Sequence, residues 1–594
     1  MSFKNYYQSE LSALRQHASL LCERQPALKA FFGQGARDPD VERLIEGTSF
    51  LTGRLREKID DELPEITHGL TQRLWGNYLR PMPSMSIVQF DPLKKSGPGQ
   101  QVPRNAEIKS CAIEGLSCGF RTVYDIEVLP LVIDRLEHAY TGDGAVLTLS
   151  LNMAINGHLG ELNLQRLRLH LTGNASISQA LYLALIRHLR AARVTLLHAN
   201  GSELHDQAGK AVRLNLDPQQ VTAVGFGDDE GLVPHPVTTY SGYRLVQEFF
   251  VFQEKFLFID VLGLGQINDL HEDVVTRASG LSLRFEFSKF NKQATRPTID
   301  NIKLYCAPII NLFSHQAFPV DLEMGQQNFP VLPENMAAEH CEVFSVQKVY
   351  GSQPAEKAHH EYLPFETCQP GLSTSGDSST TFYSLSHQQS VMNEGLITTI
   401  SFKAENPPTQ TVAIDLTCTN RNLPSRLKVG DICLAGSGIP GLLTFKNISV
   451  PTPGYAPPLE GDYLWRLISN MSLNYLSLTD VDALREILQL YDLPAFHDGG
   501  AQRSGRQFFA TLQRVSHQNI DYLMLGRPVR GTRTLLNIAP PDPEQEAQWF
   551  LLGNVLDHFF ALYASAHSFS QLQIISSSGE SWLWGARPGQ QLTL

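Results

Sequence analysis

The sequence predicts an α+β multidomain fold: an N-terminal helical segment, antiparallel β-rich middle domains and a mixed α/β C-terminal domain. Two periodicities support this prediction. Before residue 84, apolar residues recur every three to four positions, as on an amphipathic helix. In the middle of the chain they recur at every second position, as in a half-buried strand. The length of 594 residues is enough for about three to five domains.

The N-terminal segment contains one helix with clear signals, at 38–63. Asp38 suits the N-cap and Pro39 the first helical position, because proline has no amide hydrogen to satisfy there. A further helical segment opens at Pro64 and ends before Pro81. The apolar stripe of the 38–63 helix, the second of three helical segments expected before residue 84, consists of Val41, Leu44, Ile45, Thr48, Leu51, Leu55 and Ile59. The third segment adds Leu70 and Leu74. Such stripes make a small core or meet the helices of a partner chain.

The middle of the chain alternates between apolar and polar residues. The stretch LTLSLNMAI at 147–155 has leucine, methionine or isoleucine at every second position. The stretches 167–171, 283–287 and 412–418 repeat this pattern, which predicts antiparallel strands with one face toward a core. One helix is expected among them, near 178–191, because Leu181, Leu185 and Leu189 lie in line at helical spacing.

The C-terminal part reads as helices connected by short turns. The stretch MSLNYLSL at 471–478 follows a helical pattern, and Thr479 with Asp482 resembles a capping box. We therefore expect a corner between two helices, in which Asn474 needs a hydrogen-bond partner. Further on, 549–569 predicts a helix with one apolar stripe. An ordinary core helix is the favoured interpretation, and a subunit interface with aromatic anchors is the alternative.

Turn-rich stretches at 92–101, 351–380 and 450–462 suggest where the domains end. The predicted organisation is a helical segment at 1–83, a β-rich domain with one helix at 84–210, β-rich domains at 211–335 and 336–455, and an α+β domain at 456–594.

Composition narrows the possible functions. The net charge of −12 argues against whole-protein attraction to nucleic acid or anionic lipid. The eight cysteines form no CxxC pair, which favours reduced thiols in a cytosol over a disulfide scaffold. No apolar run reaches the ~18 residues of a membrane span, and the N-terminus is too polar for a signal peptide. We expect a soluble, cytoplasmic protein that does not insert into membranes.

Motifs for catalysis are weak. GLSCG at 115–119 matches the G-x-S-x-G pattern, which requires a strand before the serine and a helix after it. The residues that follow alternate like a strand instead. His340, Cys341, His359, His360 and Cys368 lack the spacing of a closed zinc site. We therefore predict no enzyme, no catalytic or metal-binding residues and no cofactor. A serine hydrolase centred on Ser117 and a ligand-binding β protein remain as alternatives.

Several long segments together resemble one known family, the TssF baseplate components of the bacterial type VI secretion system. The segments that carry the resemblance are YYQSELSALR at 6–15, DPDVERLIEGTSFLTGRLREKIDDELPE at 38–65, YLRPMPSMSIVQF at 78–90, EKFLFIDVLGL at 254–264, CAPIINLF at 306–313, TCTNRNLPSRL at 417–427, WRLISNMSLNYLSL at 465–478 and VLDHFFALYASAHSFSQL at 555–572. The sequence departs from the family pattern at Ala566 and His567, where Ile-Asn is expected, and at Asn470, where His is usual.

The resemblance implies a structural wedge subunit of a baseplate that anchors and triggers a contractile sheath in a Gram-negative bacterium. It implies two copies of the TssF chain with one TssG, together with TssE and TssK, around the VgrG spike hub and next to neighbouring wedges. It also implies a cytoplasmic location, with recruitment to the inner-membrane complex through the baseplate.

The resemblance further implies roles for particular residues. The N-terminal helices would join a core bundle with the second copy and TssG, and the β-rich parts would form wings. The expected partner-interface residues are Val41, Leu44, Leu51, Leu55, Ile59, Leu70 and Leu74. A structural helix corner would contain Trp465, Leu473, Asn474 and Tyr475, and a C-terminal aromatic helix would contain Phe559, Phe560 and Tyr563. The turn-rich joints at 351–380 and 450–462 are candidate hinges.

Overall fold

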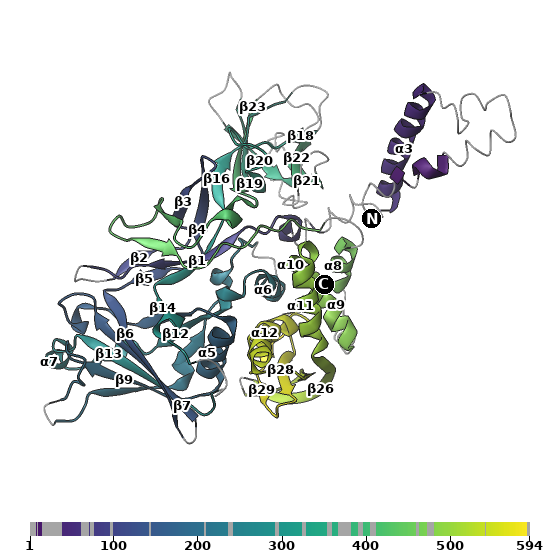
Figure 1. Cartoon of the computed structure of the whole chain (residues 1–594). Coiled ribbons are helices and arrows are strands. Elements are labelled where there is room, and N and C mark those ends of the chain that lie inside the picture. Colours follow the sequence, from purple (N-terminus) through teal and green to yellow (C-terminus); the bar gives the residue numbers. More distant parts are fainter. Residues whose placement is uncertain are drawn as a thin grey trace. The chain divides into compact units, whose positions relative to one another are not determined.

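The fold is known from a computed structural model of the chain (Figure 1). The structure describes residues 7–8, 10–14, 39–60, 71, 76–94, 99–141, 144–206, 209–235, 241–290, 296–322, 328–352, 359–365, 382–389, 396–403, 411–458, 463–471, 480–524, 526–540 and 542–590. The chain divides into two compact units, one of Met1–Arg80 with Pro457–Ser472 and one of Pro81–Ala456 with Leu473–Leu594. Helices and several antiparallel sheets confirm the predicted α+β multidomain class.

The first unit is helical where it is described. It contains α3 (Pro39–Asp60), the 3₁₀ helix η2 (Gly76–Leu79) and α8 (Tyr463–Met471). The predicted helix at 38–63 is thus confirmed over the residues that can be compared, and Asp38 lies outside the described residues. Met471 is the last residue of α8, and the rest of the expected helix corner, 472–479, also lies outside them.

The second unit begins with a six-stranded sheet in the order β24-β3-β4-β15-β1-β25. Its strands are β1 (Met85–Phe90), β3 (Glu107–Ile113), β4 (Leu116–Thr122), β15 (Cys306–Ile310), β24 (Ile432–Ala435) and β25 (Phe445–Asn447). The chain therefore returns to this sheet twice from distant parts of the sequence. Asn447 ties the two edges, because its side-chain oxygen accepts hydrogen bonds from the amides of Gly430 and Ile432, both at 2.9 Å.

Two further sheets contain the strands predicted from alternation. The five-stranded sheet has the order β10-β9-β13-β7-β6 and the four-stranded sheet the order β11-β12-β8-β14. The bounds are β6 (Leu131–Thr141), β7 (Gly144–Met153), β8 (Arg166–Leu171), β9 (Leu189–Leu197), β10 (Arg213–Leu216), β11 (Val221–Ala223), β12 (Phe258–Leu262), β13 (Gly280–Phe287) and β14 (Ile302–Leu304). A short pair joins β2 (Gln100–Val102) to β5 (Ile126–Val128). The strands expected at 147–155, 167–171 and 283–287 are confirmed as β7, β8 and β13.

The helix expected near 178–191 has different bounds. The observed helix is α5 (Ala175–Arg187), and Leu189 begins strand β9. Leu189 fits the helical spacing of Leu181 and Leu185, but it pairs with Phe287 of β13. Sheet pairing therefore overrides the local helical pattern at this residue.

The sheet around residues 313–419 has a hydrophobic core of its own. Its strands are β16 (Phe313–Gln316), β17 (Val320–Asp321), β18 (Asn328–Pro330), β19 (Glu342–Ser352), β20 (His359–Pro364), β21 (Phe382–Gln389), β22 (Leu396–Lys403) and β23 (Thr411–Thr419). The strand expected at 412–418 is confirmed as β23. Val349, Ile400 and Val412 are fully buried in this core, which is packed from within the sheet's own sequence.

The C-terminal part combines a sheet with several helices. The helices are α9 (Val481–Leu490), α10 (Leu493–His497), α11 (Gly499–Ala510), α12 (Pro543–Ala561) and, from earlier in the chain, α6 (Ser241–Val251). The strands are β26 (Leu512–Met524), β27 (Arg527–Ile538), β28 (Phe569–Ser576), β29 (Ser581–Leu583) and β30 (Arg587–Pro588). β27 and β28 are parallel, so the chain crosses between them through α12, which packs on α5, α6 and β28 (Figure 1).

The start of α9 corrects a prediction. Its N-cap is Asp480, whose carboxylate accepts a hydrogen bond from the amide of Asp482, and not Thr479. Aspartate is the better acceptor at this position, and Asp492, Asp498 and Asp542 cap α10, α11 and α12 in the same way.

The remaining helices are short and connect the strands. They are α7 (Glu272–Val275) and the 3₁₀ helices η3 (Leu159–Glu161), η4 (Pro218–Gln220), η5 (Asp228–Glu230), η6 (Gln253–Phe256), η7 (Leu264–Ile267), η8 (Ile299–Asn301) and η10 (Leu423–Arg426). The domain boundaries proposed at residues 83, 210, 335 and 455 stay predictions. No helix among the described residues has the length and apolar character to cross a bilayer.

Candidate interaction site

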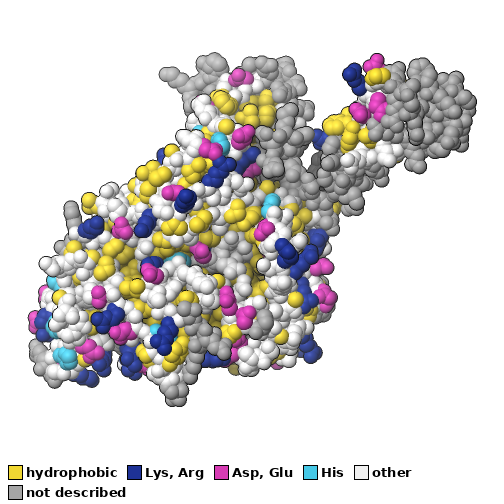
Figure 2. Space-filling view, viewed as in Figure 1, with side chains coloured by type: hydrophobic (Ala, Val, Ile, Leu, Met, Phe, Trp, Pro, Cys, Tyr) yellow, Lys and Arg dark blue, Asp and Glu magenta, His cyan; other side chains and the backbone are white. Residues whose placement is uncertain are grey.

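One face of α3 exposes large apolar side chains. Leu44 and Leu51 are each 70% exposed, and they lie seven residues apart, so two helical turns place them on the same face. Gly47 lies between them, and a Cβ added there would meet nothing within 4 Å. Figure 2 shows hydrophobic side chains along α3. We call Leu44, Gly47, Thr48 and Leu51 the exposed stripe of α3.

Two small residues on the opposite side of α3 are buried. Ser49 is fully buried and Gly53 is buried. At about 100° per residue they lie roughly 140° and 180° around the helix from Leu44. Ser49 donates a hydrogen bond to the carbonyl of Ile45 at 2.7 Å, which satisfies its hydroxyl. The helix therefore buries these two small residues and leaves Leu44 and Leu51 exposed, which reverses the usual arrangement of an amphipathic helix.

The other predicted interface residues differ in how far the structure describes them. Val41 is half-buried near the start of α3. Leu55 and Ile59 belong to α3, but their side chains are not among the described ones, and Leu70 and Leu74 lie outside the described residues. Their role in an interface stays a prediction.

The predicted helix corner is described only at its start. Trp465 lies in α8 with 38% of its surface exposed. Leu473, Asn474 and Tyr475 lie outside the described residues.

The C-terminal aromatic helix is a core element. Phe559 and Phe560 of α12 are fully buried, and Tyr563 just beyond the helix is buried too. Tyr243 of α6 packs edge-on against Phe559, with ring centroids 5.6 Å apart. These aromatic rings pack α12 against α6. At these positions α12 is therefore a core helix, which is the interpretation favoured from the sequence.

Ser117 does not have the surroundings of a catalytic nucleophile. It lies in β4, directly after the turn at Glu114 and Gly115 that joins β3 to β4. Its hydroxyl donates a hydrogen bond to the carbonyl of Ser110 at 2.5 Å. The strand–turn–helix that a nucleophile elbow needs is therefore absent at this position.

The candidate metal ligands are separated. Cys341 is buried in the core of the 313–419 sheet, whereas His340 lies 3.8 Å from the carboxylate of Glu114. His359 and His360 begin β20, and Cys368 lies outside the described residues. Over the described part of the chain, no three His, Cys, Asp or Glu residues come together as metal ligands.

A buried charge cluster links α6 to the 3₁₀ helix η6 that follows it, and the sequence analysis missed it. Lys255 and Glu248 form an ion pair with essentially no exposed surface, and Arg244 lies 3.9 Å from Glu248. Burial alone raises the pKa of Glu248, but the charges of Lys255 and Arg244 outweigh it and leave that pKa below its ordinary value. The signal in the sequence was the presence of Glu254, Lys255 and Asp260 in an otherwise apolar run.

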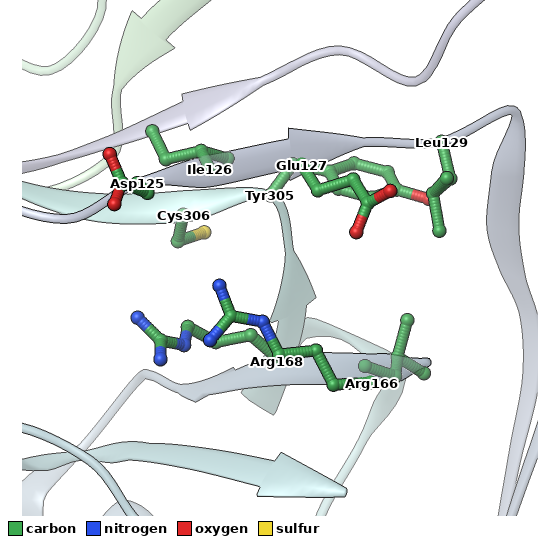
Figure 3. A pocket seen from close by; sticks show the side chains of 9 residues that line it. Asp125, Ile126, Glu127, Leu129, Arg166, Arg168, Tyr305 and Cys306 are labelled. Carbon is green, nitrogen blue, oxygen red and sulfur yellow. The ribbon is translucent and has the colours of Figure 1, made fainter. Parts of the chain in front are cut away.

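Beside this cluster, two arginines extend from β8 toward Glu127 of β5 and toward Asp125, which comes just before that strand (Figure 3). Arg168 binds Asp260 through two hydrogen bonds of 2.7 Å each. The cavity between Arg166, Arg168 and Cys306 measures about 30 Å³. That is room for a water molecule or two and far below the ~300 Å³ of a small ligand pocket, so these charges hold the fold together.

A larger groove lies between α5 and the start of α12. Its volume is about 620 Å³, and apolar side chains from both helices line it. Four carboxylates line it as well: Asp542, Glu544, Glu546 and Glu580. Lys289 is paired with Glu580, so the groove presents more negative than positive charge.

Comparisons with known proteins place the chain in a family. The family model described as type VI secretion system, TssF, matches residues 1–591. The type VI secretion system component TssF1 of Pseudomonas aeruginosa (strain PAO1) is 27% identical over 645 residues, with 99% of each chain covered. Alignment along nearly the whole length means that the resemblance does not rest on one shared domain.

Two solved structures have the same fold. A chain in the cryo-electron microscopy structure of the type VI secretion system TssK-TssF-TssG baseplate subcomplex has a TM-score of 0.75 and 27% identity, and the match covers 93% of this chain and 99% of that one. A chain in the baseplate complex from the type VI secretion system has a TM-score of 0.64 and 23% identity, with both chains covered completely. Since the family model spans nearly every residue, the protein described above belongs to the TssF family of the type VI secretion system.

Proposed function

We propose that this protein is a non-catalytic structural subunit of a type VI secretion baseplate, and that the exposed stripe of α3 binds a partner chain there. The observation that carries the proposal is the 70% exposure of both Leu44 and Leu51. Family membership supports the setting, as does the 27% identical chain solved within a TssK-TssF-TssG subcomplex.

The energetics of the stripe favour a helical partner. Fully burying an exposed leucine stabilises a structure by about 1.5–3 kcal/mol. Leu44 and Leu51 repeat at the heptad interval, which matches one seam of a coiled coil. Gly47 has open space around it, so a second helix can approach the backbone closely between the two leucines.

The finer composition of the assembly follows from the family resemblance. We propose two copies of this chain with one TssG, contacts with TssE and TssK, and a position around the VgrG hub beside neighbouring wedges. Recruitment to the inner membrane would then occur through the baseplate and not through this chain. The 313–419 sheet is a suitable wing because its hydrophobic core comes from its own strands.

Co-expression with TssG from the same genome tests the proposal. The purified material would be analysed by size-exclusion chromatography with light scattering, which reports mass independently of shape. We expect one complex whose mass equals two copies of this chain and one TssG. A folded chain that elutes as a monomer, apart from well-expressed TssG, would contradict the proposal.

A further inference from the structure

Two exposed cysteines lie next to each other on adjacent strands. Cys111 is on β3 and Cys433 is on β24, and both side chains are exposed. Their sulfur atoms are 3.7 Å apart, although the residues are 322 positions apart in the sequence. The amide of Cys111 donates a hydrogen bond to the carbonyl of Asp431 at 2.8 Å, so the backbone holds the two strands together at this point.

We propose that Cys111 and Cys433 form a disulfide on exposure to a peroxide oxidant and so make a covalent modification site on the six-stranded sheet. A disulfide has sulfur atoms about 2.0 Å apart. The register shifts between Ile432 and Leu434, so Cys433 sits at an irregularity of the ladder. Such an irregularity gives the side chain more room to adjust than a regular ladder position does.

The chemistry balances with hydrogen peroxide as the oxidant. One thiolate attacks the peroxide, its sulfur becomes a sulfenic acid, and water leaves. The second thiol then attacks that sulfur, the S–S bond forms, and the hydroxyl group leaves as a second water. Two thiols and one peroxide thus give one disulfide and two waters, with both electrons passing from sulfur to oxygen.

Four other cysteines contrast with this pair. Cys118, Cys306, Cys341 and Cys418 are buried, so dissolved oxidant does not reach their sulfur atoms directly. Burial raises the pKa of Cys118 to about 11, which leaves it a thiol near neutral pH. Among the described cysteines, Cys111 and Cys433 combine exposure, which gives the oxidant access to sulfur, with proximity, which lets the second thiol reach the oxidised one.

The disulfide would tie an edge strand to the sheet. β24 is at one end of the strand order and pairs with β3. The chain between Cys111 and Cys433 includes the entire 313–419 sheet. Oxidation would therefore join β24, which follows that sheet in the sequence, covalently to β3. The disulfide would hold the two strands together even after cleavage of the chain anywhere between the two cysteines.

Peptide mapping of the full-length chain tests the proposal. The reduced chain is treated with hydrogen peroxide, its remaining thiols are blocked, and it is digested with trypsin and a glutamate-specific protease without reductant. Cleavage after Glu114 separates Cys111 from Cys118, so the two thiols are distinguished. We expect a linked peptide pair containing Cys111 and Cys433, two hydrogens lighter than the sum of the two peptides, which dithiothreitol separates.

Serine variants supply the controls. Cys111→Ser and Cys433→Ser should each abolish the linked peptide, whereas Cys118→Ser, on the next strand, should retain it. The number of thiols in the native chain that react with a thiol-reactive disulfide dye should fall by two on oxidation. Recovery of Cys111 and Cys433 only in unlinked peptides, or a linkage that joins two separate chains, would overturn the proposal.

Discussion

At the scale of single residues, the buried pair of Lys255 and Glu248 offers the sharpest test of stability. Lys255→Met would leave the Glu248 carboxylate buried without its ammonium partner. Breaking one side of a buried ion pair costs about 3–5 kcal/mol. We expect a lower thermal unfolding midpoint and faster amide hydrogen exchange in α6 and β12.

A double variant and a surface control complete this test. Lys255→Met with Glu248→Gln removes both charges and should recover part of the loss. Lys446→Met, at an exposed position of β25, should leave the unfolding midpoint unchanged. An unchanged unfolding midpoint for Lys255→Met would mean that the ion pair of Lys255 and Glu248 does not stabilise the fold.

The environment of His558 leads us to expect that the folded chain loses stability as the pH falls. Its ring stacks on Phe226, and its Nε2 accepts a hydrogen bond from Arg587 at 3.1 Å, which requires the neutral ring. Burial, with Arg587 and Arg244 nearby, lowers the pKa of His558 to about 3 from its ordinary 6.5. Because the unfolded chain binds the proton more readily, this contribution to stability is lost as the pH falls from 6.5 toward 3.

The measurement compares wild type and His558→Gln at pH 7.5 and pH 5. One such histidine contributes a slope of at most about 1.4 kcal/mol per pH unit. The wild type should lose more stability on acidification than the variant does. Equal losses in the two proteins would show that His558 is protonated with its ordinary pKa in the folded chain.

At the scale of helices, we expect truncation of one side chain to alanine to affect stability differently in α3 and in α12. Phe559→Ala in α12 removes a fully buried ring and should destabilise the chain by about 3–5 kcal/mol. Leu51→Ala in α3 removes an exposed side chain and should change stability by no more than about 0.5 kcal/mol. Thermal unfolding of the isolated chain separates these cases, and a large loss for Leu51→Ala would mean that the stripe is already covered within the chain.

The same two helices illustrate how far sequence patterns reach. The apolar period indicated both helices, because a helix is a local structure whose period shows in a short window. The bounds of the second were wrong, since a helix was expected at 549–569, whereas α12 runs from Pro543 to Ala561 and Phe569 begins strand β28. The pattern could not tell that α12 is largely buried while α3 exposes its leucines, since this depends on which segments pack nearby. Leu189 and Thr479 fitted local patterns too, but strand pairing with Phe287 and a better cap at Asp480 decided the outcome.

At the scale of the whole molecule, local sequence patterns could not predict which distant segments pair with one another. β24 and β25 join a sheet that begins near residue 85, and Cys111 meets Cys433 across that sheet. Arg168 of β8 likewise binds Asp260 of β12, a partner 92 positions away in the sequence. The sequence contained these residues, but alternation and spacing within a segment do not report partners from distant segments.

The turn-rich joints predict where the molecule is cut most easily. If 351–380 and 450–462 act as hinges, brief digestion of the free protein should cleave first within them but outside strand β20 (His359–Pro364), because exposed loops are the preferred sites of proteolysis. N-terminal sequencing and mass spectrometry of the first fragments would locate the cuts. First cuts that spare both joints would count against their role as hinges.

The measurement that tests the central claim most directly is the binding of TssG by Leu51→Asp, with Glu46→Lys as a charge change at an exposed position outside the exposed stripe. Both positions are exposed on α3, so both variants should fold with unchanged circular dichroism and thermal midpoints. On co-expression with TssG, we expect Leu51→Asp to lose the complex and Glu46→Lys to keep it. Full recovery of the complex with Leu51→Asp would contradict the claim that this face of α3 joins the protein to its partner.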